Sequence, residues 1–247
     1  MSKRVFMKIA YDGTGYCGWQ MQINGITVEE VINRELSELL KEDIAVIGAS
    51  RTDSGVHALG NVAVFDTDTK IPGEKICFAL NQRLPEDIRI VESMEVDGEF
   101  HPRYCNSAKT YEYKILNARF PIPTERLYSH FVFLPLDIEK MKEAAQYIVG
   151  EHDFKSFCSS RSQVENTVRT VYGLDIWKEN DMIHIKIKGN GFLYNMVRII
   201  AGTLIKVGLK VYPPEHVKEI IEAKDRNVAG PKAPACGLTL VGIEYEK

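Results

Sequence analysis

A short segment of the chain, ASRTDSGVHALG at residues 49–60, gathers three side chains that could do chemistry. Arg51, Asp53 and His57 fall within seven positions. A carboxylate can act as a nucleophile or a base, and an arginine or histidine beside it can bind an anionic substrate. Strand patterns lie on both sides of the segment, so it is a loop that could present one carboxylate to a substrate.

Two other interpretations of this loop are open. In the first, a polar side chain caps a solvated turn and Arg51 forms a surface ion pair. In the second, Asp53 and His57 bind a metal ion together with His101 or Asp66, although no clustered motif with recognised ligand spacing supplies the remaining ligands. For an isolated R-x-D-x-x-x-H pattern the solvated turn is the default, so the rest of the chain must decide.

A glycine-rich turn, YDGTGYCGW at residues 11–19, contains a G-x-G-x-x-G pattern after a predicted strand. A dinucleotide site needs a helix that opens at this turn, so that its N–H groups meet the pyrophosphate. A further turn at Asn24-Gly25 intervenes before the next helix, and we interpret the glycines as turn residues. Trp19 and Gln20, if exposed, could stack on a base and hydrogen-bond to it.

The elements that position these segments alternate between strands and helices. The first hundred residues run strand, helix, strand, strand, helix, strand, which is the order of a ferredoxin-like unit. Thr27 is the predicted N-cap of the first helix, and Glu30 completes a capping box. The predicted elements of this half are 4–11, 28–41, 44–49, 61–67, 73–84 and 88–93.

The second half of the chain has a similar outline, with Asp137 as a predicted helix cap. Its predicted elements are the strand 107–116, the helix 138–149, the strands 167–177 and 182–189, the helices 191–207 and 214–224, and the strand 238–245. We therefore predict an α+β fold of two ferredoxin-like halves, residues 1–105 and 106–247. The halves would form a continuous, mainly antiparallel sheet with helices on one side and a cleft on the other.

The composition excludes several classes of protein. Of the 247 residues, 45% are hydrophobic and 26% are charged, which is typical of soluble globular proteins. The longest apolar runs are far shorter than the ~20 residues that span a bilayer. The N-terminal sequence MSKRVFMKIAYDG lacks the apolar core of a signal peptide. We expect a cytoplasmic protein without a membrane partner.

The cysteine pattern and the net charge exclude fewer classes of protein. Five cysteines without a CxxC pair argue against a disulfide framework and a zinc knuckle. A net charge of −3 is not the basic signature of a nucleic-acid-binding protein. The 31 lysines and arginines could still gather on one face.

Six motifs occur in a fixed order along the chain. They are YDG…GWQ, RTDSGVHA, FHPRY at 100–104, KTYEY at 109–113, GEHDFKSF at 150–157 and GFLYNMVR at 191–198. Together they resemble the bacterial tRNA pseudouridine synthase A family over essentially the whole chain. Two positions depart from the family pattern: Ser50 stands where glycine usually precedes Arg-Thr-Asp, and Met21 stands where many members have a basic residue.

The resemblance implies a reaction on RNA. Members convert uridine to pseudouridine at positions 38, 39 and 40 of the tRNA anticodon arm, without a metal or an organic cofactor. Carried over by motif, Asp53 would be the catalytic aspartate, Tyr111 would stack on the target base, and Arg198 would pair with the aspartate. The cleft would bind RNA, and the family implies a homodimer in which one tRNA touches both subunits.

The reaction that the resemblance implies requires a similar set of chemical groups. A carboxylate is suited to attack an anomeric carbon with oxocarbenium character, as in retaining glycosidases. The leaving base returns as the nucleophile, so one carboxylate can suffice. Because a guanidinium beside it would stabilise the charged carboxylate, we predict an Asp53–Arg198 ion pair. Whether the aspartate attacks C1′ or abstracts a proton to give a glycal is open.

The remaining polar residues have less specific roles. Arg51 would support the vacancy left by a flipped nucleotide or contact a phosphate, and His57 would either contact RNA or hold the loop's shape. His101 is interpreted as structural. A basic strip facing the RNA would act mainly on affinity. Its candidate members are Arg103, Lys109, Lys155, Arg161 and Arg169.

Three alternative functions remain at this stage. The chain could carry out the same chemistry on other uridines, or it could be a non-catalytic RNA-binding protein that uses the same cleft. A metal-dependent hydrolase is the least favoured, and full activity in EDTA would exclude it.

Overall fold

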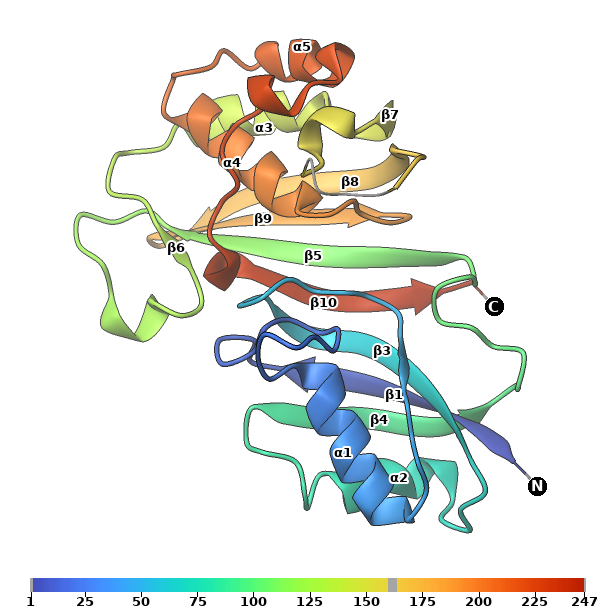
Figure 1. The fold of residues 1–247 in the computed structure, drawn as a ribbon. Helices are drawn as coiled ribbons and strands as arrows, with labels where there is room; N and C mark the ends of the chain where they lie inside the picture. Colours follow the sequence, from blue (N-terminus) through green and yellow to red (C-terminus); the bar gives the residue numbers. More distant parts are fainter. Residues whose placement is uncertain (1, 160–163, 247) are drawn as a thin grey trace. The chain divides into compact units, whose positions relative to one another are not determined.

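The computed structural model describes residues 2–159 and 164–246 (Figure 1). Ten strands and five α-helices occur in these ranges, which confirms the predicted α+β fold. The chain divides into two units: Met1–Asn106 with Leu240–Lys247, and Ser107–Thr239. The last strand therefore belongs mainly to the first unit, whereas the sequence pattern grouped it with the second half. Strand pairing is not limited to neighbours in sequence, so periodicity alone could not show this.

The first unit is built on an antiparallel sheet. Strand β1 (Lys3–Tyr11) lies between β4 (Ile88–Val96) and β3 (His57–Thr67). The short β2 (Ile47–Gly48) pairs with β3, and β10 (Leu238–Tyr245) is a further neighbour of β3. The order β4-β1-β3-β2 is that of a ferredoxin-like unit. Alternate residues of β1 are buried, as expected for a strand with one covered face.

The helices α1 (Val28–Leu40) and α2 (Gly73–Leu80) belong to this unit and contact each other. Helix α1 begins as predicted, because the Thr27 side chain accepts a hydrogen bond from the Glu30 N–H. Helix α2 ends at Leu80, four residues before the predicted end. Its C-cap, Asn81, uses its side chain to exchange hydrogen bonds with the backbone of Ile90 on β4 instead.

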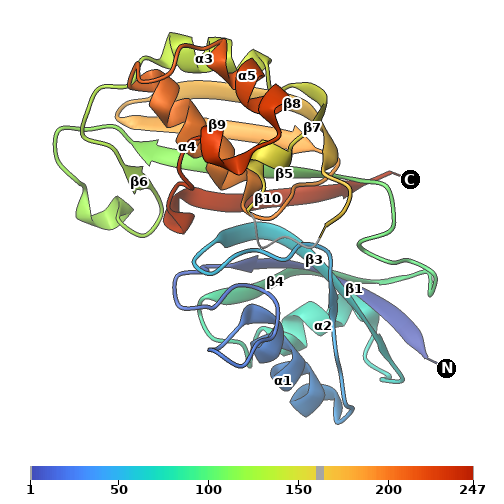
Figure 2. The same cartoon turned by 45° about the horizontal axis from the view of Figure 1, so that its top comes forward.

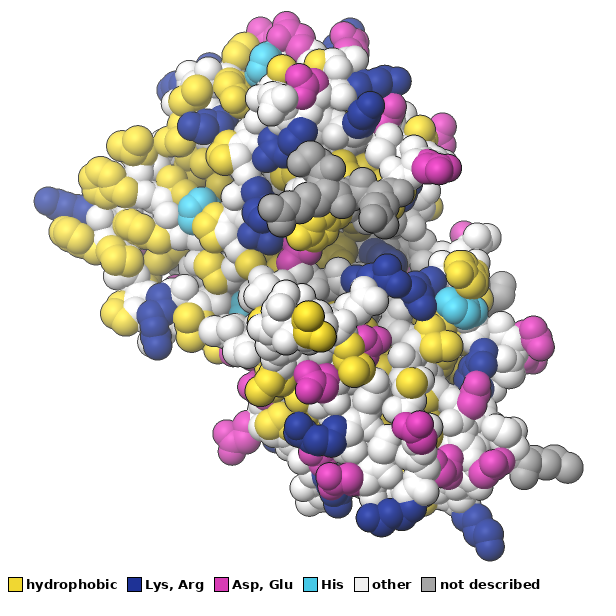
Figure 3. All heavy atoms as spheres, viewed as in Figure 1, with side chains coloured by type: hydrophobic (Ala, Val, Ile, Leu, Met, Phe, Trp, Pro, Cys, Tyr) yellow, Lys and Arg dark blue, Asp and Glu magenta, His cyan; other side chains and the backbone are white. Residues whose placement is uncertain are grey.

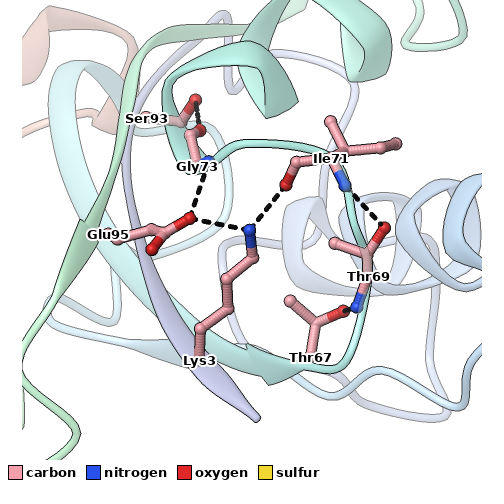
Figure 4. A network of polar contacts seen from close by, with 7 residues as sticks. All are labelled: Lys3, Thr67, Thr69, Ile71, Gly73, Ser93 and Glu95. Carbon is pink, nitrogen blue, oxygen red and sulfur yellow. Dashed lines mark hydrogen bonds and ion pairs between the residues drawn. The ribbon is translucent and has the colours of Figure 1, made fainter. Parts of the chain in front are cut away.

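A polar network fixes the start of α2 (Figure 4). The Glu95 carboxylate accepts hydrogen bonds from Lys3 Nζ at 2.7 Å and from the Gly73 N–H at 3.1 Å. Lys3 also donates to the Ile71 carbonyl at 2.7 Å, and Ser93 Oγ donates to the Gly73 carbonyl at 2.6 Å. The Lys3 contact, followed by the Gly73 N–H, lowers the pKa of Glu95. The network ties the N-terminus of α2 to β1 and β4.

The second unit has its own antiparallel strands. β5 (Ser107–Leu116) pairs with β9 (Met182–Gly189), β9 with β8 (Val168–Glu179), and β8 with β7 (Gly150–Asp153). The two-residue β6 (His130–Phe131) adds to β5 in parallel. Neither β6 nor β7 was predicted, because such short strands contain too few residues to show an alternating pattern.

Three α-helices lie on one face of these strands: α3 (Ile138–Gln146), α4 (Met196–Gly208) and α5 (His216–Ala223) (Figures 1 and 2). Asp137 caps α3 as predicted, accepting from the Lys140 N–H. Helix α4 begins at Met196, five residues after the predicted start, because Asn195 before it has a left-handed backbone with φ of 63°. The 3₁₀ helices are η1 (Pro123–Glu125), η2 (Lys155–Phe157), η3 (Arg226–Val228) and η4 (Ala235–Gly237).

A search of residues 2–159 and 164–246 finds no helix that is both long enough and apolar enough to cross a membrane.

Candidate active site

The Arg-Thr-Asp loop of the first unit connects β2 to β3 and is held mainly through its backbone. The Thr52 carbonyl accepts from the Trp19 N–H at 3.1 Å, and the Asp53 carbonyl accepts from the Val56 N–H at 3.1 Å. The Thr52 hydroxyl is buried and lies 2.7 Å from the Tyr11 hydroxyl. These contacts fix the backbone on both sides of Asp53.

The glycine-rich turn at residues 11–19 packs directly against this loop. Gly18 has φ of 87°, and a Cβ placed on it would lie 2.6 Å from the Thr52 carbonyl oxygen. A Cβ on Gly13 would collide with the Val56 carbonyl. The interpretation of these glycines as turn residues is thus confirmed, since α1 opens only at Val28. Their function is to let two loops approach each other closely.

Trp19 does not have the exposed position that base stacking would need. Its side chain is 1% exposed, and its ring lies 6.0 Å from that of Tyr11. The indole also covers Gly48, where a Cβ would overlap it. The suggestion that Trp19 stacks on a base is therefore wrong, and Trp19 belongs to the packing beneath the loop. Gln20 is exposed.

His57, at the end of the loop, is buried with its Nδ1 facing two groups. Nδ1 lies 3.1 Å from the Gly13 N and 3.1 Å from Asp12 Oδ1. One nitrogen cannot accept from Gly13 and donate to Asp12 at the same time. A backbone N–H can only donate, and Asp12 Oδ1 already accepts from the backbone N–H and hydroxyl of Thr14, so we assign the Gly13 hydrogen bond. The ring thus connects the two loops, which agrees with a role in loop shape.

The other residues of the loop differ in exposure. Arg51 is exposed, Asp53 is half-buried, and Ser50 is buried with 6% of its surface exposed. The Ser50 carbonyl accepts from Asn61 Nδ2 on β3 at 3.0 Å. The unusual Ser50 is therefore accommodated in the interior of this unit.

In the second unit, Tyr111 lies on β5 opposite Ile187 of β9 and is 8% exposed. Its ring meets that of Phe192 edge to face, with centroids 5.3 Å apart. Phe192 comes from the part of the GFLYNMVR motif that precedes α4. The two motifs therefore meet through their aromatic rings.

Arg198 lies in the first turn of α4 and is 8% exposed. Its Nε donates to the Ala233 carbonyl at 2.8 Å, and its Nη1 donates to Asn195 Oδ1 at 3.1 Å. Asn195 in turn donates from Nδ2 to Ser159 Oγ at 2.8 Å. Asn195 is a positioning residue that we did not identify from the sequence. Its spacing of three from Arg198 within the predicted helix 191–207 could have revealed it.

Two groups near Arg198, the buried Tyr113 and the half-buried Cys236, are uncharged in their ordinary states. Burial raises the pKa of Tyr113 well above its usual range, with Cys236 adding to the effect and the Arg198 charge opposing it. Burial also raises the pKa of Cys236, again opposed by Arg198. The Tyr113 hydroxyl donates to the Pro234 carbonyl at 2.9 Å. The guanidinium therefore lies in surroundings of low polarity, where an anionic partner would be bound strongly.

The residues of the predicted basic strip lie on both units. In the second unit, Lys155 is exposed, and Arg169 is half-buried and donates to the Asn166 carbonyl at 3.0 Å. Burial lowers the pKa of Arg169. Lys109 is half-buried, Arg103 of the first unit is exposed, and Arg161 lies outside the described residues.

The proposed metal ligands have other contacts. Both carboxylate oxygens of Asp66 accept from Arg4, at 2.8 and 2.7 Å, and the Arg4 hydrogen bond lowers the pKa of Asp66. His101 accepts from the Arg103 N–H at 3.2 Å, within a tight turn. In the part of the chain that the structure describes, no group of three or more His, Cys, Asp or Glu side chains is placed to hold a metal ion.

The predicted site residues are thus distributed over the two units. The first unit places Arg51, Asp53 and His57 on one loop above the glycine-rich turn. The second unit places Tyr111 and Arg198 on neighbouring elements, β5 and α4.

Comparison with known proteins identifies the family. A family model described as tRNA pseudouridine synthase matches residues 7–105 and 144–246. The chain belongs to the tRNA pseudouridine synthase family. It is 50% identical over 243 residues to "tRNA pseudouridine synthase A" of Thermoanaerobacter sp. (strain X514), covering 98% of this chain and 100% of that protein.

Two further relatives carry the same name. The protein of Ruminiclostridium cellulolyticum is 50% identical over 244 residues, and that of Brevibacillus brevis is 47% identical over 243 residues. Each alignment covers 98% of this chain and 100% of the relative. This pseudouridine synthase is therefore an isomerase that acts on tRNA, as the ordered motifs predict.

Proposed function

We propose that this enzyme isomerises uridine to pseudouridine at positions 38, 39 and 40 of the tRNA anticodon stem-loop, with Asp53 as the nucleophile and without a cofactor. We further propose that it works in the cytoplasm as a homodimer. The observation that carries the proposal is the Arg-Thr-Asp loop, in which backbone hydrogen bonds fix the chain on both sides of the half-buried Asp53.

The proposed reaction needs one carboxylate. An Asp53 oxygen bonds to C1′ of the ribose as the N1–C1′ bond breaks, and the uracil leaves with the electron pair. After the base turns over, C5 bonds to C1′ and displaces the carboxylate. The C5 proton is then lost and N1 takes up a proton, so substrate and product are isomers. This sequence parallels the covalent step of retaining glycosidases.

Arg198 is proposed as the partner of the Asp53 carboxylate. Hydrogen bonds to the Ala233 carbonyl and to Asn195 fix the plane of the guanidinium. The position at the N-terminus of α4 adds a partial positive charge to the full charge of the side chain. A cation in this position is unfavourable for the helix itself, which supports a role in binding an anion.

The remaining roles follow from position. Tyr111 would stack on the target base and hold it after cleavage, and its hydroxyl could help to remove the C5 proton. Arg51, exposed on the loop, would support the vacancy of the flipped nucleotide or contact a phosphate. His57, bonded to Gly13, would hold the loop's shape.

The test is tritium release from tRNA labelled at C5 of uridine. Asp53→Asn should lower the rate by at least about 10³-fold, since removal of a nucleophile leaves only binding and electrostatic effects. Asp43→Asn, an exposed aspartate of the same unit, is the matched control and should retain the wild-type rate. Release at the wild-type rate by Asp53→Asn would refute the proposed role.

Two further measurements separate the alternatives. Mapping of pseudouridines in tRNA from a deletion strain shows whether positions 38, 39 and 40 are the targets. Undiminished tritium release in EDTA would support the cofactor-free reaction, and a loss restored by a divalent metal would contradict it.

A further inference from the structure

A turn of the first unit, residues 101–104, presents two aromatic rings that the proposed catalysis does not use. The rings of His101 and Tyr104 are stacked, with centroids 4.1 Å apart and an interplanar angle of 20°. Tyr104 is 84% exposed although one face of its ring lies against His101, so the opposite face is open to solvent. Arg103 between them in sequence is also exposed. We call this segment the stacked turn.

Local hydrogen bonds set the conformation of the stacked turn. The His101 carbonyl accepts from the N–H groups of Tyr104 at 3.1 Å and Cys105 at 3.2 Å. On the imidazole, Nδ1 accepts from the Arg103 N–H at 3.2 Å. The same backbone that closes the turn therefore also fixes the imidazole on which the tyrosine ring lies.

Two strands of the same unit anchor the stacked turn. Tyr245 of β10 donates its hydroxyl to the Pro102 carbonyl at 2.9 Å, and Arg4 of β1 donates to the Phe100 carbonyl at 3.0 Å. The Phe100 ring meets those of Phe6 and Tyr245, with centroids 6.0 and 5.1 Å away. The exposed ring pair thus stands on a fixed support, which lowers the entropy lost when a partner binds.

We propose that the stacked turn binds an unpaired base of the tRNA outside the active site, with Tyr104 stacking on the base and Arg103 contacting a neighbouring phosphate. Every base has a π-face, so an aromatic ring that is open on one side and supported on the other can hold it without regard to sequence. An adjacent guanidinium suits a phosphate. The inference rests on the tRNA substrate of the family and not on the proposed nucleophile.

The base on the stacked turn is not the target of the reaction. The turn is anchored by Arg4 near the start of β1, whereas Tyr11 at the end of β1 contacts Thr52 of the Arg-Thr-Asp loop. The extended strand between Arg4 and Tyr11 spans roughly 20 Å. A nucleotide on Tyr104 and a nucleotide at Asp53 therefore belong to different parts of one tRNA.

The charges of the first unit favour such a local contact. On the face shown in Figure 3, lysines and arginines are interspersed with aspartates and glutamates around α1 and α2. A mixed surface gives RNA little non-specific attraction, so a contact of defined geometry has more influence on affinity. Within residues 2–159 and 164–246, Arg103 forms no ion pair, and its guanidinium is available to a phosphate.

A protein is a less suitable occupant of the stacked turn. A stable protein interface buries about 800 Å² per partner around an apolar centre. The turn supplies one open ring with a charged side chain beside it, which matches the size of a single nucleotide.

Filter binding of tRNA to the full chain tests the inference. Tyr104→Ala should raise the dissociation constant about 5- to 150-fold, the range expected for the loss of one stacked base. Tyr104→Phe should bind as the wild type does, because the ring and not the hydroxyl makes the contact. Phe78→Ala is the matched control and should also leave the dissociation constant unchanged. Phe78 is 66% exposed on α2 of the same unit, with Lys75 Nζ 5.5 Å from its ring.

The salt dependence of binding separates the two proposed contacts. Arg103→Gln should reduce the slope of log Kd against log salt concentration by about one, as expected for one lost phosphate contact. Tyr104→Ala should weaken binding without changing that slope. Single-turnover tritium release at saturating tRNA should stay at the wild-type rate in both variants, since neither side chain reaches the reacting atoms.

The outcomes are separable from those of the catalytic proposal. Equal tRNA affinity of the wild type and Tyr104→Ala would overturn the inference even if tritium release were normal, and this result is expected if the turn binds a protein instead. An equal loss of affinity in Phe78→Ala would overturn it as well. Weaker binding by Tyr104→Ala that Tyr104→Phe restores would support the inference even if Asp53→Asn remained active.

Discussion

The loop at residues 50–56 and the first turn of α4 differ in what holds their charged side chains. The loop around Asp53 is fixed by backbone hydrogen bonds and by glycines that let a second loop approach. In α4 the charged side chain itself forms the bonds, from Arg198 to Asn195 and to the Ala233 carbonyl. A charged side chain can thus be positioned by its backbone, or it can itself form the hydrogen bonds that position it. The two cases respond differently to substitution.

After Asp53→Asn, the largest effect is expected from Arg198→Ala. If the guanidinium stabilises the proposed nucleophile, turnover should fall on the order of 10²- to 10³-fold while tRNA affinity changes little. The lost hydrogen bonds should also lower the free energy of unfolding by about 1–3 kcal/mol. Single-turnover tritium release, filter binding and urea unfolding measure the three quantities.

Lys206→Ala is the control for this prediction, because Lys206 lies in the last turn of the same helix and is half-exposed. It should leave turnover unchanged. Normal turnover by a folded Arg198→Ala enzyme would show that the arginine is structural only. The comparison of the two regions would then lose its proposed functional residue in α4.

A smaller effect is expected from Gly18→Ala, which tests the backbone-held loop. The backbone φ of 87° and the approach of the Thr52 carbonyl oxygen to 2.6 Å from a Cβ leave no room for a methyl group. The strain should lower the free energy of unfolding by about 1–3 kcal/mol and displace the loop, so that turnover also falls. Urea unfolding and tritium release check both effects.

Gly15→Ala is the matched control, because a Cβ at Gly15 meets no atom within 4 Å. Both measurements should match the wild type. Equal behaviour of the two alanine variants would contradict the argument that close loop packing sets the position of Asp53.

The smallest effect concerns a carboxylate that only supports the structure. Asp153 accepts from Thr167 Oγ1 at 2.5 Å and from the Lys155 N–H at 3.2 Å, and pairs with Lys224 at 3.1 Å. The Thr167 hydrogen bond is the main cause of its lowered pKa, while burial opposes it. A lowered native pKa stabilises the fold above the unfolded-state value, about 3.9, and this contribution is lost as the pH falls through the native value.

Urea unfolding between about pH 6 and pH 2 should therefore show a steeper acid loss of stability in the wild type than in Asp153→Asn, by a few tenths of a kcal/mol to about 1 kcal/mol. Asp175→Asn, an exposed residue of β8, is the control and should keep the steeper loss. Identical pH profiles for the wild type and Asp153→Asn would contradict the assigned contacts.

Local chemistry in the sequence predicted much of the fold. Strand alternation placed β1, β5 and β9 within one residue of their observed ends, and the caps at Thr27 and Asp137 form as predicted. These features depend on residues within a few positions of one another. The start of α4 was placed too early, because the left-handed conformation of Asn195 is not visible in a periodic apolar pattern.

Features that depend on contacts between distant residues were harder to predict from the sequence. The burial of Trp19 requires Gly48 beneath its indole, and the GWQ motif alone left the exposure of Trp19 open. The placement of the last strand beside β3 and the anchoring of Arg198 by Ala233 are both long-range. The pairing of Asp53 with Arg198 stays a prediction of the same long-range kind.

The hydrogen bond from Arg198 to Ala233 has a consequence for the order of events during protein synthesis. Ala233 follows Arg198 by 35 positions, so helix α4 leaves the ribosome well before the residue that fixes its arginine. Strand β10, which follows Ala233, then adds to a sheet whose other strands were made much earlier. A nascent chain would therefore acquire α4 before the contact that fixes Arg198, and its last strand after all the others.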